Sequence, residues 1–101
     1  MSAVMGSEKI VGEIDAHIKQ EGSGYSQWYC GIASDPKERL FNDHNVSEKN
    51  GWWIFRDAGS DDGARRVEDY FIRKGCKGGG GGGDSGTRHV YAYRITSTTR
   101  E

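Results

Sequence analysis

The chain has 101 residues, of which 34% are hydrophobic, and its 14 lysines and arginines against 15 acidic residues leave a formal net charge of −1. This length predicts one domain spanning residues 1–101, which buries roughly two thirds of the surface that its unfolded chain exposes. The near-neutral charge excludes a global positive field for nonspecific nucleic-acid binding, so any contact with DNA or RNA must use a local basic patch.

An amphipathic helix is the first predicted element, over about residues 8–20. Apolar side chains recur there at three- and four-residue spacing, at Ile10, Val11, Ile14 and Ile18. This spacing is typical of one buried helix face, and Ser7 is the predicted N-cap. We expect residues 1–7, which precede the helix, to be flexible.

A buried strand is predicted next, over residues 27–33, because this stretch is aromatic and β-prone and has the length of one strand. Asp35 and Pro36 then predict the start of a second helix, which runs to about His44. An aspartate caps free backbone amides, and proline fits the first helical position.

The rest of the chain predicts a strand, a helix and a final strand. The second strand covers residues 52–55, and the third helix covers 61–74, with acidic residues in its first turn and basic ones in its last, as the helix dipole favours. Gly75 is its natural stop. A glycine-rich loop over 77–88 precedes an alternating third strand at 89–96. The order of elements predicts an α+β domain with a small three-stranded sheet flanked by about three helices.

The two cysteines, Cys30 and Cys76, lie far apart in the sequence and match no metal-ligand spacing, so two free thiols are expected. No apolar run approaches the roughly 20 residues of a transmembrane helix. The N-terminus also lacks the apolar stretch of a signal peptide. We therefore expect a reduced, cytoplasmic protein without a membrane partner.

Glu68 lies on the helix face that should be buried, within a turn of Ala64, Val67, Phe71 and Ile72. A carboxylate in such surroundings needs a partner. One interpretation is a structural salt bridge with an arginine such as Arg39 or Arg56. The other is a metal ligand or an acid/base group at a cleft. The helix by itself leaves both open.

Arg39 lies one turn after Asp35, beside Leu40 on the predicted inner side of its helix. A guanidinium held there can bind a phosphate with two parallel hydrogen bonds. The alternative is a solvated surface arginine. His44 follows Leu40 by four residues and shares its face, where a histidine bonded to the backbone is the commoner outcome.

Residues 28–40 resemble the second half of the GIY-YIG nuclease signature. In that family a strand carrying Tyr-Ile-Gly is followed by a short turn and a helix with an invariant arginine. Here Tyr29-Cys30-Gly31 matches the triplet, and Arg39 falls at the family's distance from it. His44 stands where many members have a histidine.

A second block extends the resemblance to roughly residues 27–74. Trp53 on a strand, then Ser60, and Ala64 and Glu68 on a helix are similar to the family's next block, in which the glutamate binds the catalytic metal.

The resemblance implies a metal-dependent phosphodiesterase that cuts DNA. Glu68 would hold Mg²⁺, with Mn²⁺ as the alternative ion, and Arg39 would bind the phosphate. Tyr29 would activate or orient the attacking water, and His44 would assist proton transfer.

The family's opening Gly-Ile-Tyr strand is missing before Tyr29, where a helix and a polar loop are predicted instead. We expect the C-terminal strand to occupy the vacated place in the sheet as a permuted replacement, with Tyr91 or Tyr93 restoring the missing phenol. The alternative is that both tyrosines simply pack. Glycines also replace the Pro-x-x-Asn-like segment that follows the glutamate helix in the family.

Two further hypotheses remain open. A catalytically inactive GIY-YIG-like module could bind a nucleic acid, a nucleotide or a protein, as an accessory or inhibitor protein of the kind that small stand-alone chains provide in phages and bacteria. A purely structural domain would instead pair Arg39 with Glu68. The sequence leaves the oligomeric state open.

Overall fold

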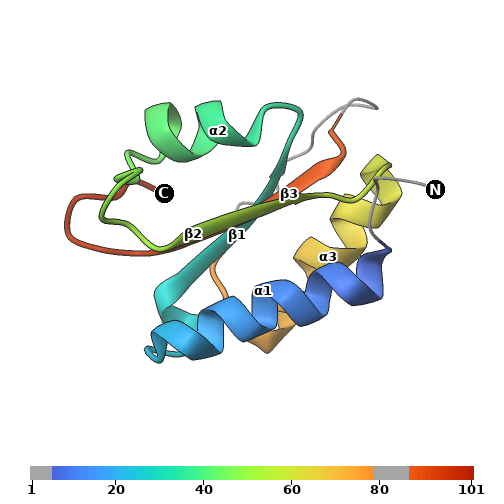
Figure 1. Ribbon diagram of the computed structural model, residues 1–101, viewed down its shortest axis with the longest axis horizontal. Coiled ribbons are helices and arrows are strands. Elements are labelled where there is room, and N and C mark those ends of the chain that lie inside the picture. Colours follow the sequence, from blue (N-terminus) through green and yellow to red (C-terminus); the bar gives the residue numbers. More distant parts are fainter. Residues whose placement is uncertain (1–5, 79–86) are drawn as a thin grey trace.

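The computed structural model describes residues 6–78 and 87–101 and has an α+β fold with a three-stranded antiparallel sheet and three helices (Figure 1). The main elements, in chain order, are α1 (Ser7–Glu21), β1 (Trp28–Ala33), α2 (Pro36–Glu38), β2 (Trp53–Asp57), α3 (Asp61–Lys74) and β3 (His89–Arg94). A 3₁₀ turn, Tyr25–Gln27, precedes β1. The predicted fold class is therefore confirmed. Within the described residues no helix combines the length and apolarity needed to cross a membrane.

The C-terminal strand β3 is the central strand of the sheet, because the strand order is β1-β3-β2. It runs antiparallel to both neighbours. Tyr91 lies opposite Gly31 on β1 and opposite Phe55 on β2, and Tyr93 lies opposite Tyr29 and Trp53. Residues from three separate segments of the chain thus meet on one face of the sheet.

The two faces of the sheet carry different layers of helix (Figure 1). Alternation along β1 sends Trp28, Cys30 and Ile32 into a core shared with α1 and α3. The residues between them, such as Tyr29, face the opposite layer, which contains α2 and the buried Leu40. Any group on the Tyr29 face is therefore separated by the sheet from groups on the α3 face.

Helix α1 begins one residue earlier than predicted. Gly6 is its N-cap and has no side chain to accept a hydrogen bond, while Ser7 is the first helical residue. The prediction of Ser7 as N-cap is therefore wrong. Of the segment 1–7 that was predicted to be flexible, residues 1–5 lie outside the described residues. Gly22 ends the helix with a φ of 92°, the left-handed conformation that glycine adopts without strain.

Helix α2 starts as predicted but soon widens. The side chain of Asp35 accepts a hydrogen bond from the backbone N–H of Glu38, and Pro36 fills the first turn. From Arg39 to Asp43 the chain follows a π-helical turn, in which the N–H of His44 bonds to the carbonyl of Arg39. Such wide turns are frequent at functional sites, and this one positions His44 over the sheet.

Helix α3 has the predicted bounds, with Ser60 as its N-cap and Gly75 at its end. The chain then returns along the outer edge of β1, where the N–H and carbonyl of Lys77 bond to Trp28 and Cys30. The predicted glycine-rich loop over 77–88 therefore does not begin at Lys77, and residues 79–86 lie outside the described residues.

Both cysteines are buried free thiols, as predicted. Burial raises the pKa of Cys76 to about 11 and that of Cys30 well above its ordinary value. Their thiolates are therefore disfavoured at neutral pH, and both side chains act as small core residues.

Candidate functional site

The side chain of Tyr91 crosses from the central strand onto its neighbour β1. An ideal Cβ atom built on Gly31 would lie 2.6 Å from the Tyr91 hydroxyl oxygen and 2.7 Å from the ring carbon that bears it. No side chain could fill that space together with the phenol. The absence of a side chain at Gly31 therefore leaves the space that the Tyr91 ring occupies, although the two residues are far apart in the sequence.

His44 fixes the Tyr91 hydroxyl from above the sheet. Its Nε2 lies 2.7 Å from the Tyr91 oxygen, and its Nδ1 lies 2.7 Å from the backbone carbonyl of Arg100. The Tyr93 hydroxyl lies 3.0 Å from the same Nδ1 and donates to the Arg100 carbonyl at 3.1 Å. His44 and Tyr91 are 4% and 1% exposed, so this network is shielded from bulk water.

These contacts determine where the protons lie. A carbonyl can only accept, so Nδ1 of His44 carries the proton that it donates to Arg100. Nε2 is left as an acceptor, and the Tyr91 hydroxyl donates to it. Burial lowers the pKa of His44, which favours this neutral form. Burial also raises the pKa of Tyr91 and so keeps the phenol protonated.

Tyr29 completes the buried part of the cluster. Its ring centroid lies 4.7 Å from that of His44 and 5.2 Å from that of Tyr93, and its plane is nearly parallel to Tyr93. Offset aromatic contacts at these distances stabilise the arrangement beyond simple burial. The phenols of Tyr29 and Tyr91 are close enough for Tyr29 to raise the pKa of Tyr91.

Arg39 lies at the exposed rim of the same cluster. Its side chain bonds to the Tyr91 hydroxyl, which raises the pKa of the guanidinium. Its Nη1 also pairs with Asp43 at 3.3 Å, with both side chains about half exposed. The prediction that Arg39 faces the inner side of its helix is wrong as to burial, because Leu40 fills the inner position. The contact with Tyr91 nevertheless places its guanidinium at the site.

Glu68 lies on α3, against the opposite face of the sheet. Burial raises the pKa of its carboxyl, Asp69 adds to this rise, and Arg65 partly offsets it. The charge of Glu68 in turn raises the pKa of Cys30, so Glu68 lies near the side of β1 that faces α3. The arginines considered as salt-bridge partners pair elsewhere, Arg39 with Asp43 and Arg56 with Glu13.

The donor set for a metal ion in residues 6–78 and 87–101 is small, since no group of three or more His, Cys, Asp or Glu side chains gathers there. Mg²⁺ is commonly held by one or two carboxylates with water completing its shell. Glu68 is a single half-buried carboxylate whose pKa is raised by burial and by Asp69, so its ionised form would need a compensating positive charge.

The structure brings together four of the predicted site residues, Tyr29, Arg39, His44 and Tyr91, and places Glu68 on the other side of the edge strand β1. The sequence reasoning named Tyr93 as an alternative to Tyr91 for the missing phenol, but it did not foresee two contributors, the carbonyl of Arg100 and the role of Gly31. The alternation of the last strand indicates that Tyr91 and Tyr93 share a face. No sequence signal marks a backbone carbonyl near the C-terminus as a partner of His44.

The cluster combines a phenol that can pass a proton, a neutral imidazole that can accept it, and an exposed guanidinium that can bind an anion. No family model, curated protein or solved structure matches this chain. The chemistry of these side chains is therefore the basis for a function.

Proposed function

We propose that the protein is a metal-dependent phosphodiesterase, a DNA endonuclease on a permuted GIY-YIG-like plan. The observation that supports this most is the convergence of Tyr29, Arg39, His44 and Tyr91 around the position of Gly31. Three separate segments of the chain supply these groups, and the Tyr-x-Gly strand and the C-terminal tyrosine strand lie side by side.

Because Tyr91 is only 1% exposed, the attacking water would have to enter as Arg39 turns to the phosphate, and it would then transfer its proton through Tyr91. As the water oxygen bonds to phosphorus, its proton passes to the Tyr91 oxygen while the Tyr91 proton passes to Nε2 of His44. The resulting imidazolium keeps its Nδ1–H on the Arg100 carbonyl. The leaving oxygen departs with the electrons of the broken P–O bond and takes a proton from solvent.

Arg39 would hold the phosphate. Its guanidinium is exposed and carries two hydrogen-bonding contacts, to Asp43 and to Tyr91. A guanidinium can exchange such contacts for two parallel bonds to phosphate oxygens. When Arg39 turns to the phosphate, the Tyr91 oxygen regains a free lone pair, which the attacking water can use.

Glu68 would hold Mg²⁺ or Mn²⁺. A bound divalent ion would supply neutralisation of negative charge on the part of the substrate at the α3 side of β1, since the sheet separates Glu68 from the phosphate at Arg39. The two parts of the site share the strand β1, whose Tyr29 faces α2 and whose Cys30 faces α3.

A second function is a binding module without catalysis. The placement of Glu68 on the face opposite Tyr91 favours it, because a metal at Glu68 alone would not touch the buried phenol. The tyrosine cluster and Arg39 would then serve only to hold an anionic partner, a nucleic acid, a nucleotide or an accessory-type protein partner.

Cleavage assays separate these two functions. Plasmid, branched and single-stranded DNAs are incubated with the wild type, with Glu68→Gln and with Arg39→Lys, in Mg²⁺, in Mn²⁺ and in chelator. Cutting that requires the metal and is lost in both variants supports the nuclease. Binding of the same DNAs in chelator, without cutting by any protein in any metal, supports the binding module.

A further inference from the structure

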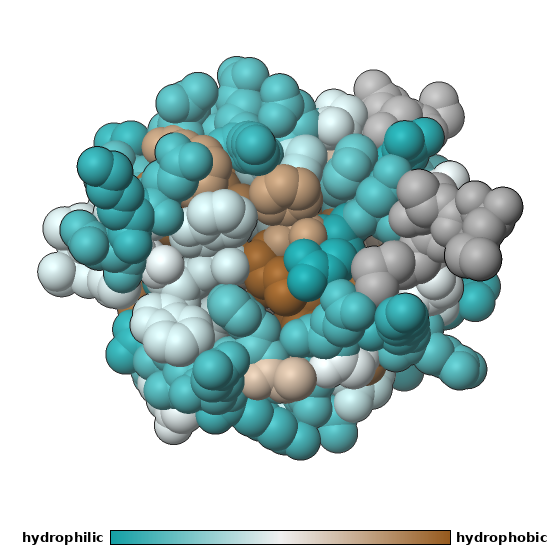
Figure 2. Space-filling model, in the orientation of Figure 1, coloured by the Kyte–Doolittle hydropathy of each residue, from teal (hydrophilic) through white to brown (hydrophobic). Residues whose placement is uncertain are grey.

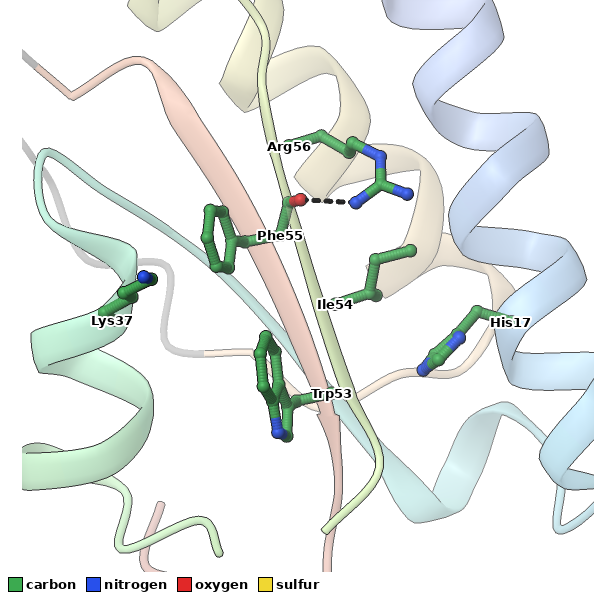
Figure 3. Close-up of a pocket in the computed structure, with 6 residues that line it drawn as sticks. All are labelled: His17, Lys37, Trp53, Ile54, Phe55 and Arg56. Atoms are coloured by element: carbon green, nitrogen blue, oxygen red, sulfur yellow. Dashed lines mark hydrogen bonds between the residues drawn. The ribbon is translucent and has the colours of Figure 1, made fainter. Parts of the chain in front are cut away.

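A hollow lies along the outer edge of β2, away from the tyrosine cluster. It has a volume of about 460 Å³ and is lined by His17, Lys37, Trp53, Ile54, Phe55 and Arg56 (Figure 3). Helix α2 borders it on one side of the strand and α1 on the other (Figure 1). In the same view, Figure 2 shows a small apolar patch in this region surrounded by hydrophilic side chains.

The α2 side of the hollow is an aromatic platform. The rings of Trp53 and Phe55 are nearly parallel, with an interplanar angle of 6° and centroids 6.1 Å apart. Both point toward the side from which Lys37 projects (Figure 3). The indole is held in place by an edge contact with Phe41 at 5.1 Å and by a bond from its Nε1 to the Glu48 carbonyl at 3.1 Å. The platform is therefore preformed.

The backbone edge of β2 presents outward N–H donors, and one of its outward acceptors is already occupied. Trp52 bonds to Arg94 of β3 and Ala58 bonds to Arg88 just before it, so the alternation of the ladder turns the backbone groups of Trp53 and Phe55 outward. The outward carbonyl of Phe55 accepts from Nη1 of Arg56 at 2.7 Å. The outward N–H groups of Trp53 and Phe55 are the donors of the edge.

The ionisable residues that line the hollow are His17, Lys37 and Arg56. Arg56 pairs with Glu13 at 2.7 Å, and burial lowers the pKa of His17 and so favours its neutral form, which leaves Lys37 as the cation that faces the aromatic side. A ligand that suits this edge is an anion rich in acceptors. A partner strand is less well matched, because strand addition needs free carbonyls as well as N–H groups, and the guanidinium of Arg56 already occupies the Phe55 carbonyl.

We propose that this hollow binds an unpaired nucleobase together with its phosphate. The base would stack on Trp53 and Phe55, and the phosphate would lie against Lys37 and the donor edge of β2. The site is distinct from the tyrosine cluster, because Lys37 lines this hollow whereas Arg39, two residues on, bonds to Tyr91. It stands whether or not the protein cleaves DNA.

The test is fluorescence anisotropy of a labelled ten-residue oligothymidylate in chelator, where no cleavage can contribute. The variants are Phe55→Leu, which keeps an apolar side chain without a ring, and Lys37→Gln. The matched controls are Tyr70→Leu, which removes a 37% exposed ring from α3, and Lys9→Gln, an exposed position on α1. Circular dichroism and a melting curve establish that each variant is folded.

We expect the wild type to bind the strand and Phe55→Leu to weaken binding roughly fivefold or more, as the loss of one stacking surface does. Lys37→Gln should lower the slope of log affinity against log salt by roughly 0.7, the contribution of one phosphate contact on a single strand. The controls should bind as the wild type does. If thymidine monophosphate competes with the labelled strand at a similar concentration of nucleotide, a free nucleotide is sufficient for binding. If only the unlabelled strand competes, the site recognises the nucleic acid.

Three results would overturn the assignment. One is absence of binding of either ligand by the folded wild type. Another is binding that Phe55→Leu and Lys37→Gln leave unchanged. The third is equal binding of a fully paired duplex, which offers no base to stack. Because none of these readouts depends on Mg²⁺, they are independent of the outcome of the cleavage assays.

Discussion

The Tyr91 hydroxyl oxygen lies 2.6 Å from the point that a Cβ atom of residue 31 would occupy. A glycine early in the chain thus provides the space for a phenol near its end. Their strands pair directly, with Gly31 opposite Tyr91. This contact ties the candidate site to the position of the last strand in the middle of the sheet, and changing either residue should disturb both the packing and the chemistry.

Gly31→Ala should destabilise the protein by about 1–3 kcal/mol, because the new methyl group must displace the buried Tyr91 ring. Urea unfolding followed by circular dichroism measures the change. Gly12→Ala is the matched control: no atom lies within 4 Å of its added Cβ, and it stands inside α1. There alanine should stabilise by roughly 0.5–1 kcal/mol. Equal effects of the two substitutions would contradict the close fit of Tyr91 over residue 31.

Tyr91→Phe should cost about 1–3 kcal/mol of unfolding free energy, because it leaves the buried Nε2 of His44 without its donor. Tyr93→Phe should cost less. The Tyr93 hydroxyl donates to the Arg100 carbonyl, and without it that carbonyl still accepts from the Nδ1–H of His44, so no buried acceptor loses its last donor. Denaturant melts of the two variants, which lose the same atom from neighbouring sites, measure the difference. A larger loss for Tyr93→Phe would show that the hydrogen-bond roles are assigned wrongly.

The fold was largely predictable because its cues are local. The helix over 61–74 begins and ends where the capping and glycine signals indicate, and the strand over 27–33 matches its aromatic run to within one residue. The widening of α2 after Glu38 has no such cue. It depends on packing against the sheet, since Leu40 and His44 must both face the strands.

The candidate site was predictable only in part. The spacing from Tyr29 to Arg39 and His44 lies within one strand and the following helix, so the sequence indicates their proximity. The place of Tyr91 depends on strand order, which no local pattern determines. It could be anticipated only by assuming that the C-terminal strand replaces the missing first strand of the family. The sequence left the exposure of Arg39 open between an inner and a solvated position, because helical spacing does not describe a π-helical turn.

Acid should destabilise the protein through His44. Its pKa is lowered from 6.5, chiefly by burial, with Arg39 adding to this fall and Asp43, Glu101 and the Arg100 carbonyl opposing it. A base whose folded pKa lies below its unfolded value contributes stability above the unfolded pKa. That stability is lost as the pH falls through the folded pKa.

Unfolding free energy should therefore decline as the pH drops below about 6.5, and His44→Gln should reduce the slope of this decline. His17, whose pKa is also lowered, will retain a slope of its own. NMR titration of the imidazoles gives the two pKa values separately. A His44 pKa above 6.5 would contradict the neutral, Nδ1-protonated form.

Glu68→Gln should leave the unfolding free energy at pH 7 unchanged or raise it by up to about 0.5 kcal/mol, since water screens a half-buried side chain. Burial raises the pKa of Glu68, so its carboxyl favours folding below its unfolded pKa. This contribution is lost as the pH rises through the folded value. At neutral pH the charge opposes folding, and the amide removes it.

Asp69→Asn is the control for that substitution, since Asp69 is exposed and pairs with Arg73 at 3.0 Å. Its effect should stay within about 0.5 kcal/mol. A loss of several kcal/mol in Glu68→Gln is what removal of one partner of a buried ion pair produces. That outcome would identify Glu68 as a structural residue.

The most direct test of the assigned chemistry is the rate of DNA cleavage by the wild type, Tyr91→Phe and Tyr93→Phe, each in Mg²⁺ and in chelator. We expect metal-dependent cutting by the wild type, a loss of roughly a hundredfold or more in Tyr91→Phe, as for removal of a proton-transferring group, and a rate in Tyr93→Phe within a few fold of wild type. Cutting by Tyr91→Phe at the wild-type rate, or no cutting by folded wild type on any substrate, would contradict a hydrolytic site built around Tyr91.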